Sequence, residues 1–354
     1  MHIRGFFLTG LLLPVFIFAC GCNKDNGTGV PQGPKWRTFT TANSPLINNH
    51  VNAVAVDASE AIWFGTNGGA STLHGSAWNS FVSELAYTTY GEGGGIEHVV
   101  NSIAVGSDGS TWFALNGGGL RRYLPTATTT QWRSYTSSDN PTPFYSDLVS
   151  QIASDNFATG GNTEIWVIGL LGVSKYTPRT TDPQNGDWTI YSTDDGLPTD
   201  WITSTQVNFH SRTIWFGSYY GDLTSYDNNR HWSTQKIPYA NVGQVQCIAF
   251  DGYNNLWAGI ADGAYRVGSG PTLFTTADGL PSNNVHAIIS DLQNFKWIGT
   301  DGGLTEYNNS SFTTFNHSNS PLPSDTVLAL ALDLDNKVWI GTTGGAAVYD
   351  PSGK

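Results

Sequence analysis

The sequence is short of charge and of cysteine, and each shortage narrows the classes of protein that it can encode. Charged residues make up 12% of its 354 residues, with 16 Lys and Arg against 28 Asp and Glu, so the formal net charge is −12. Nucleic acids and anionic membrane surfaces are bound through clustered basic residues, and the basic residues of this chain are scattered. We therefore expect no nucleic-acid partner.

Cysteine occurs three times, and only Cys247 lies beyond the first 22 residues. A disulfide framework is therefore not expected, even in a compartment that permits one. No set of Cys and His has zinc spacing, and the Asp-rich stretch at Asp333 lacks the loop and terminal Glu of a calcium site. The glycine-rich turns lack the Lys-Ser/Thr and the helix of a phosphate-binding loop. The sequence thus predicts no metal and no other cofactor.

Glycine and aromatic residues are what the chain has in quantity. It contains 41 Gly, 13 Trp, 15 Tyr and 17 Phe. Together with the small number of Lys and Glu, this is a composition of strands and turns that is poor in helix formers. It favours an all-β fold.

The N-terminal region differs from the rest of the chain. Residues 6–19 form an apolar stretch that is too short to span a bilayer and has the length of a secretory signal. The stretch ends in "IFACGC", which resembles the signal of bacterial lipoproteins, in which a cysteine after small residues carries the lipid. Cys20 and Cys22 both fit as that cysteine. The polar run "NKDN" that follows resembles the start of many Bacteroidetes lipoproteins and favours Cys22.

We interpret residues 1–21 as a lipoprotein signal peptide and residues 22–34, rich in Gly and Pro, as a flexible tether. An ordinary cleaved signal is the alternative. The lipoprotein interpretation predicts a protein of the bacterial cell envelope, anchored by lipid to the outer membrane on its periplasmic side or on the cell surface. The lipid anchor would be its only contact with the membrane.

A tryptophan motif recurs along the remaining chain, as in "IWFGTNGG" from Ile62, "KWIGTDGG" from Lys296 and "VWIGTTGG" from Val338. The spacings between successive copies are 49, 54, 49, 42, 40 and 42 residues. A period of this length with several short strands per copy is typical of a propeller blade. The tryptophans of the copies are Trp63, Trp112, Trp166, Trp215, Trp257, Trp297 and Trp339.

Each copy divides into four strands, of which the first is apolar on both faces, as in "VLALALD" from Val327. Such a strand is buried on both sides, as an innermost strand between neighbouring blades would be. An Asp six residues before the Trp opens a polar turn, where its carboxylate accepts main-chain N–H groups. The sequence therefore predicts one seven-bladed β-propeller of four-stranded blades over residues 35–354.

The last copy ends after its third strand, and the chain opens with a single strand of the outermost type from Lys35 to Thr40. We expect this N-terminal strand to complete the blade of Trp339 and to close the ring, because closure removes a free sheet edge.

The joins between copies carry a further pattern. "DGLP" occurs at Asp278 and at Asp195, and with "WIGTDGGL" and the Asp six residues before the Trp in four copies it resembles the two-component regulator propeller repeat. That family occurs in extracytoplasmic sensor regions of bacterial hybrid kinases, usually as two seven-bladed rings before a membrane span and a kinase. The resemblance covers residues 36–349. Because this sequence has one ring and no kinase, we expect a binding module and no phosphotransfer.

Interblade linkers and the turns between second and third strands emerge on the same face of a propeller. The residues that begin the otherwise apolar innermost strands are polar in six of seven copies. They would form a ring at the channel mouth on this face. Either the ring is part of a binding site, or its side chains only contact the water of the channel. They are Asn52, Asn101, Ser150, Thr203, Gln246 and His286, with Leu328 in the seventh copy.

The linkers and turns near this mouth add a rim of aromatic and ionisable residues. Exposed aromatic rings beside neutral hydrogen-bonding groups suit a glycan or a peptide, which have apolar faces and polar edges. The rim residues are Trp201, Tyr219, Tyr220, Glu97, His98, Asp200 and Asp325.

Three functions fit this face. The first, which we favour, is the binding of a small glycan or peptide without catalysis. The second is an enzyme, a lyase or a glycan-acting hydrolase, for which Glu97 and His98 are the available acid/base pair. The streptogramin lyases are also seven-bladed propellers and use His and Glu with magnesium. The sequence around the linker histidines His50, His98 and His286 does not match that family closely. The third is a scaffold that docks another envelope protein.

Overall fold

The computed structural model describes residues 35–88, 95–125, 130–156, 163–179, 182–227, 229–239, 243–268, 270 and 272–353. All of them lie in one compact unit, from Gly33 to Lys354. The predicted signal peptide (1–21), both candidate lipidation sites, Cys20 and Cys22, and the predicted tether (22–34) lie outside the described residues.

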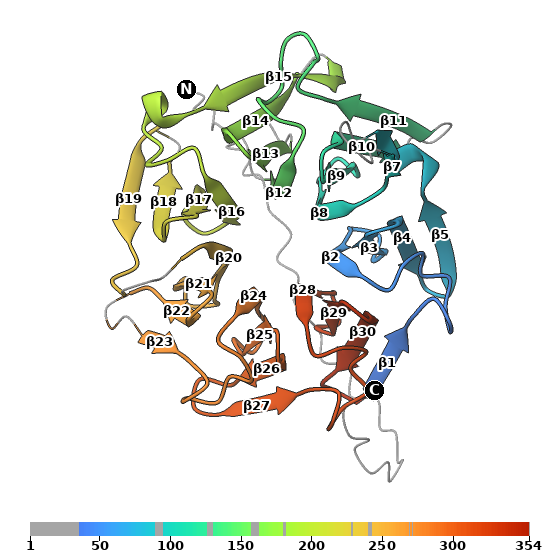
Figure 1. Ribbon diagram of the computed structural model, residues 1–354, viewed down its shortest axis with the longest axis vertical. Helices are drawn as coiled ribbons and strands as arrows, with labels where there is room; N and C mark the ends of the chain where they lie inside the picture. Colours follow the sequence, from blue (N-terminus) through green and yellow to red (C-terminus); the bar gives the residue numbers. More distant parts are fainter. Residues whose placement is uncertain are drawn as a thin grey trace, which may run out of the picture. The chain divides into compact units, whose positions relative to one another are not determined.

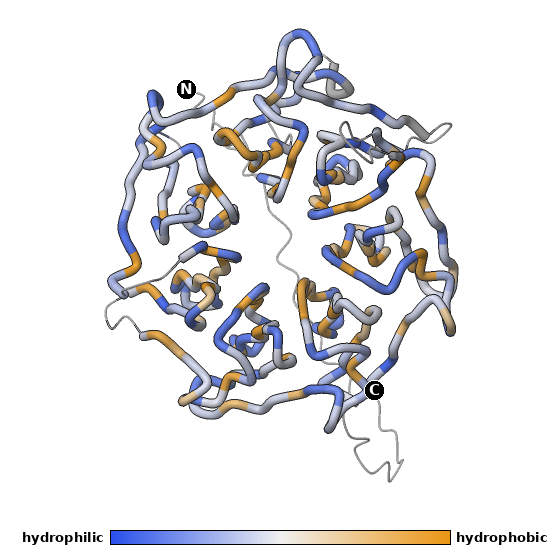
Figure 2. Tube along the Cα trace, in the orientation of Figure 1, coloured by the Kyte–Doolittle hydropathy of each residue, from blue (hydrophilic) through white to orange (hydrophobic). Residues whose placement is uncertain are grey.

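Seven four-stranded antiparallel sheets stand around a common axis (Figure 1). Each innermost strand contacts the innermost strands of both neighbouring sheets, so the series closes into a ring. The prediction of an all-β, seven-bladed propeller is confirmed. Figure 2 shows hydrophobic residues recurring in the inner strands of the blades, while outer strands such as β5 (Ala77–Phe81) are mostly exposed.

The innermost strands are β2 (Val51–Val56), β8 (Val100–Val105), β12 (Val149–Asp155), β16 (Ile202–Asn208), β20 (Val245–Phe250), β24 (Val285–Ser290) and β28 (Val327–Leu332). The second strands are β3 (Ile62–Thr66), β9 (Thr111–Leu115), β13 (Glu164–Gly169), β17 (Thr213–Ser218), β21 (Leu256–Ile260), β25 (Lys296–Thr300) and β29 (Val338–Thr342).

The third strands are β4 (Gly69–His74), β10 (Gly119–Pro125), β14 (Gly172–Arg179), β18 (Asp222–Tyr226), β22 (Gly263–Arg266), β26 (Gly303–Tyr307) and β30 (Gly345–Asp350). The outermost strands, besides β5, are β11 (Thr130–Tyr135), β15 (Asp182–Tyr191), β19 (Trp232–Lys236), β23 (Thr272–Phe274), β27 (Phe312–Phe315) and β1 (Lys35–Phe39). Outside the blades lie the short pair β6 (Tyr87–Thr88) and β7 (Ile96–Glu97), and two 3-10 turns, η1 (Ser83–Leu85) and η2 (Thr193–Asp195).

The glycine of the tryptophan motif is required by the neighbouring blade. A Cβ on Gly299 would lie 2.6 Å from Cγ1 of Val327, and one on Gly65 would lie 2.7 Å from Cγ1 of Val100. Both valines open the next innermost strand and are 0% exposed. Close packing leaves no room for a larger residue here. The second strand therefore needs glycine at the position that contacts the next blade.

Where a copy has an aspartate six residues before its motif tryptophan, the carboxylate accepts hydrogen bonds from both the main chain and the indole. In the fifth blade, Oδ1 of Asp251 accepts the main-chain N–H groups of Tyr253 (3.0 Å) and Asn255 (2.9 Å), as the sequence predicts. Its Oδ2 accepts the indole N–H of Trp257 at 3.1 Å. The same bond joins Trp63 to Asp57 at 2.9 Å. The carboxylate that organises the turn is therefore also the acceptor for the indole N–H, which would otherwise be buried without a partner.

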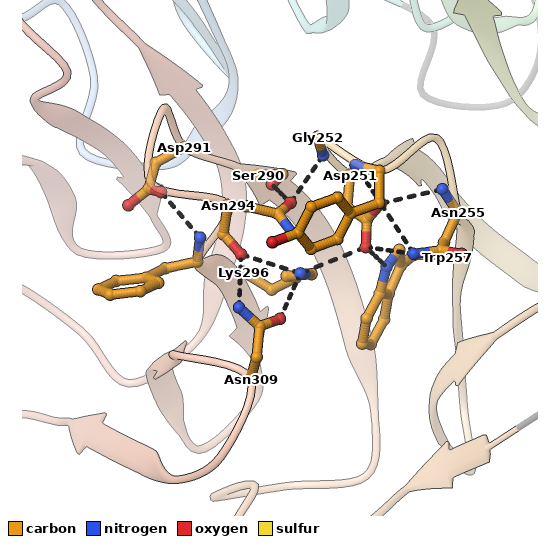
Figure 3. Close-up of polar contacts among 11 residues, drawn as sticks. Asp251, Gly252, Asn255, Trp257, Ser290, Asp291, Asn294, Lys296 and Asn309 are labelled. Atoms are coloured by element: carbon orange, nitrogen blue, oxygen red, sulfur yellow. Dashed lines mark hydrogen bonds and ion pairs between the residues drawn. The ribbon is translucent and has the colours of Figure 1, made fainter.

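A buried ion pair joins the fifth and sixth blades (Figure 3). Nζ of Lys296 lies 3.2 Å from Oδ2 of Asp251, and it donates to the main-chain oxygen of Asn294 at 2.9 Å and to Oδ1 of Asn309 at 2.6 Å. It also lies over the ring of Trp257. The three protons of the ammonium group have three acceptors, which is the condition under which a buried charge is tolerated.

The N-terminal strand closes the ring. Strand β1 (blue in Figure 1) pairs antiparallel with β30 (red), with Lys35 opposite Asp350 and Phe39 opposite Ala346. The ring of Phe39 stacks on Trp339 with centroids 5.8 Å apart, as Phe81 of β5 stacks on Trp63 at 5.4 Å. The predicted closure is therefore confirmed.

The strand directions define two faces of the ring. We call the linker face the one that carries the interblade linkers, such as residues 40–50 and 275–284, and the turns between second and third strands. We call the turn face the opposite one, which carries the turns between first and second strands, such as residues 251–255, 291–295 and 333–337. The chain enters β1 on the turn face, because Lys35 pairs with Asp350 at the end of β30.

Candidate functional site

All seven innermost strands have a β-bulge at their second residue, on the linker face. The register against the second strand shifts at this point in every blade. A bulge leaves one residue outside the ladder and redirects its side chain. The bulged residues are those that the sequence places in a ring at the channel mouth: Asn52, Asn101, Ser150, Thr203, Gln246, His286 and Leu328.

Three of these side chains bind the next blade. Asn52 donates from Nδ2 to the main-chain oxygen of Val100 at 3.0 Å, and Asn101 donates to that of Val149 at 2.9 Å. Oγ1 of Thr203 donates to the oxygen of Val245 at 2.8 Å. The polar residues at these positions therefore connect neighbouring blades, whatever else they bind.

The sixth blade carries a histidine–aspartate pair on the same face. Nε2 of His286 lies 2.6 Å from Oδ1 of Asp301, and Nδ2 of Asn284 donates to Oδ2 of Asp301 at 2.7 Å. Gln246 of the fifth blade donates to Oδ1 of Asn284. Burial would raise the pKa of Asp301, but the hydrogen bonds from His286 and Asn284 outweigh it, so this pKa lies below its usual 3.8.

Three exposed aromatic residues cluster on the linker face of the fourth blade. Trp201 ends the linker before β16, and Tyr219 and Tyr220 form the turn between β17 and β18. Their exposed fractions are 49%, 47% and 57%. Trp201 stacks on Tyr220 with centroids 6.2 Å apart and meets Tyr219 edge-on at 5.6 Å. The main-chain N–H of Tyr219 donates to the oxygen of Trp201 at 2.9 Å, which joins linker and turn.

A depression of about 380 Å³ lies beside this cluster, between the second and fourth blades. It has the volume of a small-ligand site. Its lining includes four residues singled out from the sequence, namely Asn101, Thr203, Trp201 and Tyr219, and also Ser150. Tyr220 is not among the lining residues, but it stacks on Trp201. The residues Asn52, Gln246, His286, Glu97 and His98 are not among those that line it.

Part of the lining was not foreseen from the sequence. Leu148 and Leu170 line the depression, and Leu171 beside them is exposed. Asn116 and Gln244 contribute polar groups. A signal for the leucines exists: the third copy reads "GLLG" where regular copies have a polar, glycine-rich turn. An apolar pair in a turn that the fold exposes indicates a contact surface.

Glu97 and His98 lie in the linker from the first to the second blade. Glu97 ends β7 and pairs with Tyr87 of β6, and His98 forms a bridge with Gly68 of the first blade. Burial and the nearby Glu97 carboxylate raise the pKa of Tyr87. The pair therefore stands at a different linker from the one that carries Trp201.

Within the described ranges of the chain, no three His, Cys, Asp or Glu side chains gather in a way that would hold a metal ion. None of the helices described is long and apolar enough to cross a membrane.

No protein-family model matches the sequence, and no curated protein matches it either. Many solved structures share the fold. One is the extracellular domain of the hybrid two-component system BT3049 from B. thetaiotaomicron, with 19% identity and a TM-score of 0.72. The match covers 90% of this chain and 41% of that one, so this chain spans about two fifths of the length of the sensor domain.

Two other similar structures belong to different functional classes. Virginiamycin B lyase from Staphylococcus aureus has 15% identity and a TM-score of 0.67, covering 90% of this chain and 99% of the lyase. PorZ, a surface component of the type-IX secretion system of Porphyromonas gingivalis, has 19% identity and a TM-score of 0.64, covering 88% of this chain and 48% of PorZ. At these identities the likeness establishes the seven-bladed fold.

Proposed function

We propose that this protein is an extracytoplasmic propeller that binds a glycan, a peptide or an envelope protein on its linker face without catalysis. The observation that carries the proposal is the exposed cluster of Trp201, Tyr219 and Tyr220 beside a depression of about 380 Å³. Exposed aromatic rings that pack on one another form a rigid apolar surface with polar edges, which is the chemistry of sugar and peptide sites. The sensor domain and PorZ, which share the fold, are named as extracellular or surface proteins.

The polar groups around the depression favour a neutral ligand. Its lining consists of uncharged residues, with amides from Asn101, Asn116 and Gln244 and apolar surface from Leu148 and Leu170. A sugar ring presents an apolar face to such leucines and hydroxyl groups to the amides. A peptide would present an aliphatic side chain and its main-chain amides to the same groups.

A glycan array and a peptide array probed with the full chain test this proposal. Wild type should bind a restricted set of ligands, and the combined variant Trp201→Ala/Tyr220→Ala should lose them. The matched control is Tyr145→Ala, an exposed tyrosine in the linker before the third blade. Binding that survives the combined variant would place the site elsewhere on the molecule.

We further propose that the chain is held at the outer membrane by lipid on Cys20 or Cys22, and that residues 22–34 act as a tether. The sequence pattern supports this, since both cysteines follow an apolar stretch of signal length. Labelling of cells with palmitate tests it. Label should appear on wild type and be lost from Cys20→Ala/Cys22→Ala; an unlabelled wild type would exclude the anchor.

A second candidate function is a lyase reaction at His286. The observation that favours it is the 2.6 Å contact between His286 and Asp301, which would orient the imidazole for proton transfer, together with the likeness of the fold to virginiamycin B lyase. A solved structure of that lyase holds quinupristin, which makes it the natural probe. Breakdown of quinupristin by wild type, lost in His286→Ala, would support this candidate; intact quinupristin would count against it.

A further inference from the structure

The turn face exposes a large apolar side chain in four successive blades, beginning with Phe209 of the fourth blade, which is 50% exposed. Tyr253, Leu292 and Leu334 lie in the turns between first and second strands of the fifth, sixth and seventh blades, and their exposed fractions are 76%, 80% and 72%. Single exposed hydrophobic residues are common on protein surfaces. The three most exposed of these residues, Tyr253, Leu292 and Leu334, occupy corresponding turns of adjacent blades, and we call them the apolar arc.

The arc is held in ordered turns. The main-chain N–H of Tyr253 donates to Oδ1 of Asp251 at 3.0 Å, and that of Leu292 donates to Oδ1 of Asn336 in the next blade at 3.0 Å. Asn336 has a φ of 64° and is buried, so its side chain is fixed between the two turns. The side chains of the arc are therefore presented by a rigid backbone.

Much of the charge around the arc is buried or paired, while Asp291 and Asp333 leave these turns with a small net negative charge. Asp251 and Asp291 are buried beneath it and bound by hydrogen bonds, and Asp335 beside Leu334 pairs with Lys337 at 2.7 Å. The corresponding turn of the first blade instead exposes Glu60. The large exposed apolar side chains of the turn face thus lie over the fourth to seventh blades.

The chain enters the propeller beside this arc. Lys35 starts β1 at the turn-face end of the seventh blade, the blade that carries Leu334. Twelve residues, 23–34, separate Cys22 from Lys35. Twelve residues span at most about 40 Å, so lipid on Cys22 would keep Lys35, and the turn face that it enters, within that distance of the bilayer.

We propose that, in addition to the lipid anchor and contrary to the expectation that the anchor is the only membrane contact, Tyr253, Leu292 and Leu334 rest on the lipid surface, with the turn face toward the membrane and the linker face away from it. This rests on the proposed lipid anchor. Apolar side chains that project from a surface insert at the boundary between headgroups and acyl chains, and the binding strength scales with the apolar area that they bury. The orientation would leave the depression at Trp201 open to ligands from the side away from the membrane.

Photo-crosslinking in intact membranes tests the proposal with the full chain. Benzoylphenylalanine would replace Tyr253 or Leu334 on the turn face, and Tyr219 or Leu171 on the linker face as matched controls. After irradiation, mass spectrometry would detect adducts with phosphatidylethanolamine, and palmitate incorporation would be measured on the same samples. We expect several-fold more lipid adduct from positions 253 and 334 than from positions 219 and 171.

A second set of variants tests whether the apolar side chains themselves cause the lipid contact, or whether the anchor alone brings the turn face near the bilayer. With the probe at Tyr253, the substitutions Leu292→Ser and Leu334→Ser should lower the lipid adduct several-fold, whereas Leu170→Ser and Leu171→Ser should not. Palmitate incorporation with equal adducts on both faces, or with protein adducts in place of lipid at position 253, would overturn the proposed orientation alone. Absence of palmitate would overturn the anchor and the orientation together.

Discussion

The side-chain amide of Asn52 donates a hydrogen bond to the main-chain oxygen of Val100, 3.0 Å away in the next blade. The same amide also donates to Oδ1 of Asn67 at 2.8 Å. Both of its protons are therefore used within the protein. A ring of polar residues at the channel mouth has a structural explanation here: bulged side chains tie each blade to the next. For this reason the ligand proposal rests on the aromatic cluster and not on the polar ring.

The blade-to-blade bond predicts a measurable loss of stability. Asn52→Ala should lower the free energy of unfolding by about 1 kcal/mol, because it leaves the oxygen of Val100 without this donor. Urea unfolding followed by tryptophan fluorescence would measure it. Asn79→Ala, at an exposed position of the outer strand β5, is the control and should change little. Equal stability of the two variants would show that the bond contributes nothing.

Ring closure by β1 predicts that one aromatic residue near the N-terminus controls the whole propeller. Phe39 is buried and stacks on Trp339, so Phe39→Ala should cost about 3–5 kcal/mol. Because closure completes the last blade, the loss should appear as a lower melting temperature of the single cooperative transition. Lys35→Ala, at the exposed start of the same strand, should have a small effect. A melting temperature unchanged by Phe39→Ala would contradict the role of this strand.

The buried pair of Lys296 and Asp251 predicts an asymmetry between its two partners. Asp251→Asn leaves the ammonium group buried without its counter-charge and should cost about 3 kcal/mol. Lys296→Met should cost less, because Asp251 keeps its bonds from Asn255 and Trp257. The double variant should be more stable than Asp251→Asn alone. Chemical denaturation of the three variants would measure this, and equal costs for both single variants would contradict it.

The same pair predicts a dependence on pH. Burial would raise the pKa of Asp251, but bonds from Asn255, Trp257 and Lys296 outweigh it and hold this pKa below its usual 3.8. A carboxylate with a lowered folded pKa contributes stability above its unfolded pKa and loses it as the pH falls through the folded value. The stability difference between wild type and Asp251→Asn should therefore be constant near neutrality and shrink below about pH 4. A difference that stays constant into stronger acid would rule out this linkage.

The sequence predicts the ring well because each blade repeats the same local requirements. The indole needs a buried acceptor, the motif glycine avoids the next valine, and an unpaired strand at each end of the repeat array implies closure. The depression is different, because it is formed where copies depart from the repeat. Leu170 replaces a polar turn residue, and Leu148 stands where the seventh copy has Thr326, in "SDLV" against "SDTV". Their proximity to Trp201 follows from the packing of three blades, which no single copy encodes.

The aromatic cluster predicts how ligand binding should respond to mutation and to salt. Loss of an aromatic anchor at a binding site costs about 2 kcal/mol, so Trp201→Ala should weaken affinity about thirtyfold. Because the residues that line the depression are uncharged, affinity should change little between about 50 and 500 mM salt, unlike binding through ion pairs. Calorimetric titration of the array ligand into wild type, Trp201→Ala and Tyr145→Ala would measure both effects. A steep fall in affinity with salt would indicate charged contacts, and would move the site away from Trp201 toward the ionisable residues of other linkers, such as Glu97 and His98.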